Sequence, residues 1–168
     1  EMYDQIHSMR ARVVSSPSFN SKNIIGAILF EMTMNKQING KASATYLWED
    51  LGIVPFLKID SGLEPEENGV HLLKDIYEID RKLEVAVSKG IFGTKMRSVI
   101  NSASEKGINE VVEQQFKISE QINKYNLVPI IEPEITISIT DKENAEKILM
   151  KSILNNLDEL PKDSKVIL

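Results

Sequence analysis

Hydrophobic positions along this chain form two kinds of pattern, one typical of amphipathic helices and the other of buried strands. Between residues 108 and 122 the pattern returns every three or four positions, which predicts an amphipathic helix. Continuous apolar runs such as 24–30 predict strands that are buried on both faces. The first predicted helix ends near residue 14, and the others lie at 42–51, 76–87, 108–122 and 145–153. The predicted strands lie at 24–30, 53–59, 91–96, 127–131 and 165–168.

Two of these helices carry more specific signals. Thr140 and Glu143 have the spacing of a capping box, which predicts the start of the last helix. The helix before it is expected to bury one stripe of side chains against the strands. That stripe consists of Ile108, Val111, Val112, Gln115, Ile118 and Ile122.

The alternation of helix and strand is typical of an α/β protein whose parallel strands are covered by helices. An open doubly wound sheet and a (β/α)8 (TIM) barrel both fit this order. No glycine-rich phosphate loop follows any predicted strand, whereas charged residues follow several, so the sequence favours the barrel. Because both ends of the chain cut through predicted elements, we expect residues 1–168 to form an incomplete single barrel domain, truncated at both ends.

A pair of charged residues recurs at equal intervals, each time after a short apolar run. The pairs lie at 58–60 (Lys-Ile-Asp), 95–97 (Lys-Met-Arg) and 132–134 (Glu-Pro-Glu), and both intervals are 37 residues. Side chains two positions apart on a strand point to the same face. We therefore expect three strands to direct their charges to one mouth of the barrel, at the C-terminal strand ends.

This mixture of cations and carboxylates suits acid–base chemistry on an anionic substrate. A carboxylate beside lysines can take up and release protons. Cations that lie close together lower the pKa of a lysine, and a neutral amine can then form a Schiff base. The remaining cations suit a phosphate group or a carbonyl oxygen. The competing interpretation is a salt-bridge network that plugs the mouth, although buried ion pairs are weak stabilisers.

Composition narrows the classes of partner. The net charge of −5 argues against a nucleic-acid partner, but a local group of lysines could still bind a small anion. The chain has no cysteine, which excludes a disulfide framework, a thiol nucleophile and a cysteine-ligated metal. No apolar run approaches the roughly 18 residues of a membrane span. We expect a cytoplasmic protein with no membrane partner, no metal site and no cofactor.

Four segments carry a resemblance to a known family. Residues 28–31 (Ile-Leu-Phe-Glu), 54–62 (Val-Pro-Phe-Leu-Lys-Ile-Asp-Ser-Gly), 93–97 (Gly-Thr-Lys-Met-Arg) and 127–134 (Leu-Val-Pro-Ile-Ile-Glu-Pro-Glu) look like class I, Schiff-base-forming fructose-bisphosphate aldolases of the bacterial type. The order and spacing of the segments also match, and the resemblance covers nearly the whole chain. It implies a TIM barrel of which this chain holds strands two to six with their covering helices.

The resemblance also implies an activity and roles for six residues. The reaction would be the reversible cleavage of fructose 1,6-bisphosphate to dihydroxyacetone phosphate and glyceraldehyde 3-phosphate, without a metal. Its Schiff-base lysine would come directly after Leu168. A phosphorylated sugar would be the partner, and the protein could assemble as a homo-oligomer. Glu132 would exchange protons beside a second glutamate, Glu134; Lys95 would be the cation near the reacting centre; and Lys58, Asp60 and Arg97 would contact the substrate.

Two other functions stay open on the residues alone. The Lys58-Ile59-Asp60 segment also resembles the Lys-x-Asp of phosphosugar decarboxylases, which are barrel enzymes as well. The paired glutamates argue against that assignment. The other alternative is a binding role without catalysis, because this chain does not contain the lysine that would form the Schiff base.

Overall fold

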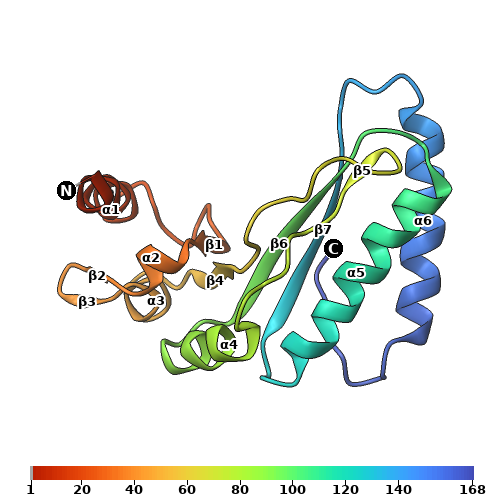
Figure 1. Cartoon of the computed structure of the whole chain (residues 1–168). Coiled ribbons are helices and arrows are strands. Elements are labelled where there is room, and N and C mark those ends of the chain that lie inside the picture. Colours follow the sequence, from red (N-terminus) through yellow and green to blue (C-terminus); the bar gives the residue numbers. More distant parts are fainter. Residues whose placement is uncertain (1) are drawn as a thin grey trace. The chain divides into compact units, whose positions relative to one another are not determined.

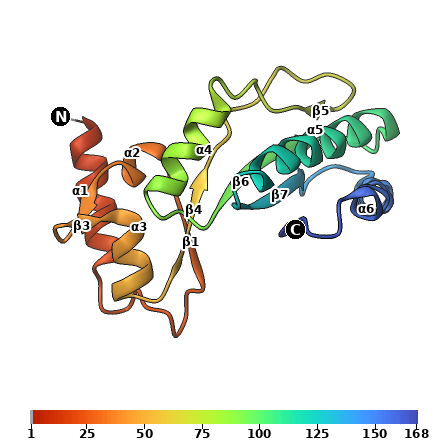
Figure 2. The same ribbon diagram turned by 90° about the horizontal axis from the view of Figure 1, so that it is seen from below.

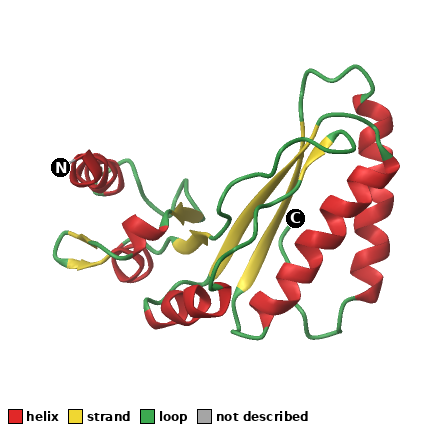
Figure 3. Ribbon diagram, viewed as in Figure 1, coloured by secondary structure: helices red, strands yellow, loops and turns green. Residues whose placement is uncertain are grey.

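The computed structural model describes residues 2–168, which form two compact units. The first unit contains the chain up to Ile59 together with Glu78–Thr94, and the second contains Asp60–Tyr77 and Lys95–Leu168. Helices alternate with strands along most of the chain (Figure 3), which confirms the predicted α/β fold class.

The first unit contains a pair of parallel strands. β1 (Gly26–Leu29) pairs with β4 (Val54–Lys58), in a register that places Gly26 opposite Val54 and Leu29 opposite Leu57. Parallel pairing of strands separated by helices is what the alternating pattern predicts. The other elements of this unit are α1 (Met2–Val14), α2 (Glu31–Met34), the hairpin strands β2 (Gln37–Ile38) and β3 (Lys41–Ala42), α3 (Ser43–Thr45), the π-helix η1 (Tyr46–Asp50) and α4 (Ile79–Ser88).

The second unit is built on two long strands and two long helices. β6 (Gly93–Ile100), which begins at the end of the first unit, pairs with β7 (Val128–Ile135). α5 (Glu105–Asn123) packs on β7, and α6 (Lys142–Glu159) packs on α5, as both views of the ribbon show (Figures 1 and 2). The last residues return to the sheet, where Ile167 forms a parallel bridge with Ile130 of β7.

The predicted stripe of α5 forms much of the core of this unit. Ile108, Val111, Val112 and Ile122 are fully buried, as expected for an amphipathic helix on a sheet. Gln115 is fully buried on the same stripe, so its amide needs hydrogen-bond partners inside the protein.

The two-residue strands β2, β3 and β5 were not predicted, and β5 changes where β6 ends. β5 (Val70–His71) pairs antiparallel with β6, with Val70 opposite Ile100 and His71 opposite Val99. A two-residue strand carries too short a pattern to be read from sequence. With this partner β6 continues to Ile100 instead of ending near Met96.

The capping box predicted for α6 was wrong. The helix begins at Lys142 with Asp141 as its N-cap, and no side chain caps it. The Asp141 side chain instead accepts a hydrogen bond from the backbone N–H of Ala103, at 2.7 Å. Asp141 therefore ties the start of α6 to the segment that follows β6. Within residues 2–168, no helix is both long and apolar enough to cross a membrane.

Candidate active site

The candidate site lies on one face of β6 and β7 in the second unit. Lys95 and Arg97 are two positions apart on β6, and Glu132 and Glu134 are two positions apart on β7. The strand period therefore places each pair on one face. Met96 lies between the two cations in sequence and is fully buried, which shows that the opposite face of β6 points into the core.

Lys95 and Glu132 form the closer of two ion pairs across these strands. Lys95 Nζ lies 2.7 Å from Glu132 Oε2. The lysine side chain is 12% exposed and the glutamate side chain 39% exposed. The cation is thus largely removed from solvent, while the carboxylate stays open to a ligand. A carboxylate held by a shielded cation and still reachable from outside can serve as a proton-transfer group.

Arg97 and Glu134 form the second pair, one strand period further along. Arg97 Nη1 lies 3.0 Å from Glu134 Oε2, and the two side chains are 48% and 42% exposed. Both partners are open to solvent, so the pair can exchange its internal contact for contact with a ligand. Arginine presents several N–H donors and can bind a carboxylate and a phosphate together.

Lys58 and Asp60 complete the six predicted residues. Lys58 is the last residue of β4 and belongs to the first unit, where its ammonium lies 5.9 Å from the centre of the Phe30 ring. The guanidinium of Arg10 lies 4.5 Å from the centre of the same ring. Lys58 and Arg10 thus both lie near the Phe30 ring. Asp60 belongs to the second unit and is half-buried two residues after β4.

The prediction that the charged pairs lie at the C-terminal ends of strands was correct for β4 and wrong for β6 and β7. Lys95 and Arg97 are the third and fifth residues of an eight-residue strand, and Glu132 also lies inside its strand. The strands extend beyond the charges because they find partners there: β5 pairs with the end of β6, and Thr136 N donates to Ile100 O at 2.9 Å.

Sequence reasoning placed Gln115 on the buried stripe but assigned it no role in the site. Its Oε1 accepts a hydrogen bond from the backbone N–H of Glu132 at 2.9 Å, and its Nε2 donates to the carbonyl oxygen of Glu132 at 3.2 Å. The same Nε2 donates to Ser98 Oγ at 3.0 Å. A polar residue on an otherwise apolar stripe was the signal that could have identified it.

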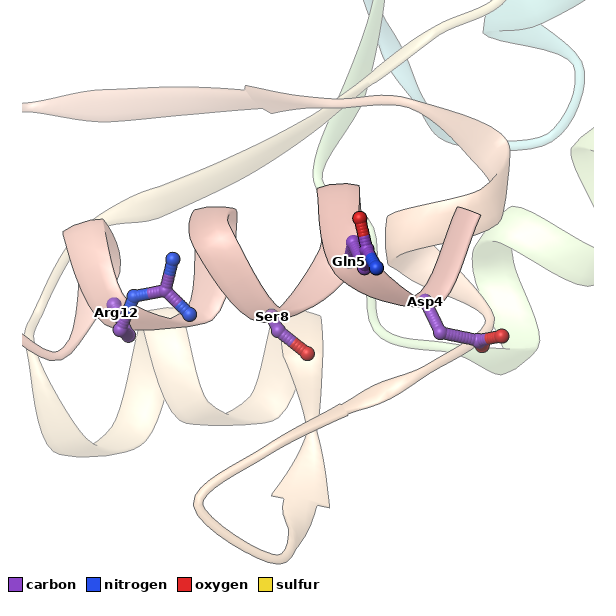
Figure 4. Close-up of a pocket in the computed structure, with 4 residues that line it drawn as sticks. All are labelled: Asp4, Gln5, Ser8 and Arg12. Carbon is purple, nitrogen blue, oxygen red and sulfur yellow. The ribbon is translucent and has the colours of Figure 1, made fainter. Parts of the chain in front are cut away.

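A hollow elsewhere on the surface carries none of the predicted residues. It measures about 470 Å³ and lies along α1, lined by Asp4, Gln5, Ser8 and Arg12 (Figure 4). A hydrogen bond from Lys36, at 2.6 Å, holds the pKa of Asp4 below its ordinary value. Across residues 2–168, no three His, Asp or Glu side chains are grouped so that they could hold a metal ion.

Comparison with known proteins places this chain in a family. The family model for glycolytic class I fructose-bisphosphate aldolases matches residues 3–168. The chain belongs to the class I fructose-bisphosphate aldolase family. The predicted resemblance is thereby confirmed. The family match also favours an aldolase over the decarboxylase that the Lys58–Asp60 segment left open.

Two relatives illustrate how much of an aldolase this chain represents. It is 52% identical, over all 168 residues, to the class 1 fructose-bisphosphate aldolase of Clostridium acetobutylicum, and it spans 57% of that protein. It also superimposes on a fructose-bisphosphate aldolase from Plasmodium falciparum with a TM-score of 0.63 and 22% identity. That match covers 80% of this chain and 44% of the other, so the structure has the fold of part of an aldolase barrel.

Proposed function

We propose that the full-length protein carrying this chain is a class I fructose-bisphosphate aldolase. It would cleave fructose 1,6-bisphosphate reversibly to dihydroxyacetone phosphate and glyceraldehyde 3-phosphate through a lysine Schiff base. The observation that carries the proposal is the contact of Lys95 with Glu132, because it combines a shielded cation with an open carboxylate in a chain of this family.

Glu132 is the group to which we assign proton transfer. Schiff-base formation removes a hydroxyl from a carbinolamine as water, so an acid must protonate that hydroxyl and a base must later recover the proton. Lys95 contacts Oε2 of Glu132, and we assign the exchange of protons to the other carboxylate oxygen. Lys95 would stabilise negative charge that develops at the reacting centre.

Arg97, Lys58 and Asp60 are the groups to which we assign substrate binding, and Glu134 would hold Arg97. Each of the two ion pairs on β6 and β7 is neutral by itself, since each joins one cation to one carboxylate. A phosphate group therefore needs a further cation. Lys58, which shares the Phe30 ring with Arg10, suits that role.

The proposal also covers the substrate class, the cellular location and the oligomeric state of the enzyme. A phosphorylated sugar is the substrate class, and we propose a cytoplasmic location because the matching family model describes glycolytic enzymes. We also propose a homo-oligomer, for which the native mass of the full-length protein is the direct measurement.

Trapping of the covalent intermediate tests this function. The full-length protein should cleave fructose 1,6-bisphosphate, and borohydride with dihydroxyacetone phosphate should inactivate it and add the mass of the reduced adduct to one lysine. Peptide mapping should place that lysine outside residues 1–168. Cleavage without any borohydride adduct would contradict the Schiff-base mechanism. An adduct on Lys58 or Lys95 would contradict the roles assigned to these residues.

A further inference from the structure

Gln115 forms a clamp on the backbone of Glu132. Its side-chain amide has the same donor and acceptor as a peptide group. It bonds both the N–H and the C=O of Glu132, at 2.9 and 3.2 Å, as a neighbouring strand would. The clamp comes from α5, which packs on β7, and it is fully buried.

The same amide connects the clamp to β6. Nε2 of Gln115 also donates to Ser98 Oγ, at 3.0 Å, and Ser98 is fully buried. Ser98 lies three residues after Lys95 on β6, so one side chain joins the strand of the cation to the strand of the carboxylate. Movement of either strand along the other would break a hydrogen bond in a buried place, where an unpaired group costs about 1–3 kcal/mol.

We propose that Gln115 is a positioning residue for catalysis, which sets the place of the Glu132 carboxylate relative to Lys95 through the backbone of β7. This rests on the proposed aldolase function. Gln115 itself touches the backbone of Glu132 and the hydroxyl of Ser98, so its effect on the reaction passes through Glu132.

The neighbouring residue provides a matched control. Gln114 clamps Leu73 in the same way, with Leu73 N donating to Oε1 at 2.8 Å and Nε2 donating to Leu73 O at 2.9 Å. It lies on the same helix and makes the same two types of bond. Its partner, however, lies in the segment after β5 and carries no candidate catalytic group. If Gln115 had only a structural role, replacing either glutamine should change kcat to a similar extent.

The test compares Gln115→Met with Gln114→Met in the full-length enzyme. Methionine has a similar shape and cannot form the amide's bonds. We expect Gln115→Met to lower kcat by about 10- to 100-fold, the range that a small misplacement of a catalytic group can cost. KM should change much less than kcat, and Gln114→Met should leave kcat close to that of the parent. Equal effects of the two substitutions on kcat would overturn the proposal.

A double variant separates positioning from general damage. In a Glu132→Gln background, Gln115→Met should lower kcat far less than it does in the parent, because the group that it positions has already been removed. An undiminished effect would mean that Gln115 acts independently of Glu132. Should Gln115→Met fail to fold, Ser98→Ala can replace it, because it removes one of the three hydrogen bonds of Gln115. Ser98→Ala should lower kcat less than the loss expected for Gln115→Met, and its effect should also be smaller in the Glu132→Gln background.

Hydrogen exchange tests the clamp independently of activity. In Gln115→Met the Glu132 amide should exchange faster, whereas in Gln114→Met the Leu73 amide should do so and Glu132 should not. An unchanged Glu132 amide in Gln115→Met would overturn the clamp, whatever the enzyme does. A full-length parent without aldolase activity would refute the proposed function, while the exchange measurement would still decide whether the clamp exists.

Discussion

The ion pairs Lys95–Glu132 and Arg97–Glu134 offer a comparison between two neighbouring places on the same two strands. Each joins a cation of β6 to a carboxylate of β7, at 2.7 and 3.0 Å, and they are one strand period apart. They differ in exposure, since the lysine side chain is 12% exposed and the arginine side chain 48% exposed. Similar charge patterns in one sheet thus provide one shielded pair and one open pair.

The difference also involves the backbone. In the Lys95–Glu132 pair, Gln115 fixes the backbone N–H and C=O of Glu132. Two strand periods further on, beyond the Arg97–Glu134 pair, Thr136 Oγ1 donates a hydrogen bond to Asn101 Oδ1, at 2.6 Å. The comparison teaches that shielding and backbone support, more than the charges themselves, distinguish a candidate proton-transfer group from a candidate ligand-binding group.

The largest expected effect would come from removing the carboxylate of Glu132. Glu132→Gln keeps the size of the side chain and removes the group that titrates. We expect kcat of the full-length enzyme to fall by about 10²- to 10⁴-fold, the usual contribution of a general acid–base group. Glu134→Gln, the matched change in the open pair, should cost less. The measurement is the steady-state rate of fructose 1,6-bisphosphate cleavage, and a larger loss in Glu134→Gln would reverse the assignment of the two glutamates.

A smaller effect is expected on stability, where the two pairs can be compared by double-mutant cycles. Lys95→Met with Glu132→Gln should give a coupling free energy of about 1–3 kcal/mol, because the cation is shielded from water. Arg97→Met with Glu134→Gln should give at most about 1 kcal/mol, as exposed pairs do. The free energy of unfolding of each variant in urea provides both values.

Added salt sharpens this comparison. Raising the salt concentration should weaken the coupling of the Arg97–Glu134 pair more than that of Lys95–Glu132, because mobile ions screen exposed charges more strongly. Equal coupling energies with the same dependence on salt would show that exposure does not separate the two pairs.

The smallest effect is expected for the pair formed by Asp4 and Lys36, in which the carboxylate side chain is 71% exposed. Their contact of 2.6 Å lowers the pKa of Asp4 below its ordinary value of 3.8. A carboxyl group whose pKa is lowered by folding stabilises the folded state above its unfolded pKa and loses this contribution as the pH falls through the folded pKa. Asp4→Asn should therefore destabilise the protein slightly at neutral pH and not in strong acid. Unfolding in urea at both pH values measures this, and a difference that persists in acid would contradict the assignment to charge.

The sequence predicted the main features of the fold because they depend on local periodicity. Five of the six predicted stripe residues on α5 are buried because the helix period alone places them, whereas Ile118 is only half-buried. The cores of β1, β4, β6 and β7 were also predicted, whereas the predicted strand at 165–168 forms only a single bridge, through Ile167. The end of β6 was missed because it depends on β5, which comes from a separate part of the chain. The capping box failed for a similar reason, as Asp141 bonds Ala103 instead of its own helix.

By itself, the sequence determined which residues share a face, that Gln115 falls on a buried stripe, and which family the chain resembles. A period of two residues fixes the side of a strand on which a side chain lies, wherever that strand is packed. The tertiary structure decided that Lys95 meets Glu132, that Arg97 meets Glu134, and that their exposures differ. It also decided that Gln115 holds the backbone of Glu132. These contacts join residues far apart in the chain, and they depend on the register of neighbouring strands and on the helix packed against them, which no local pattern encodes.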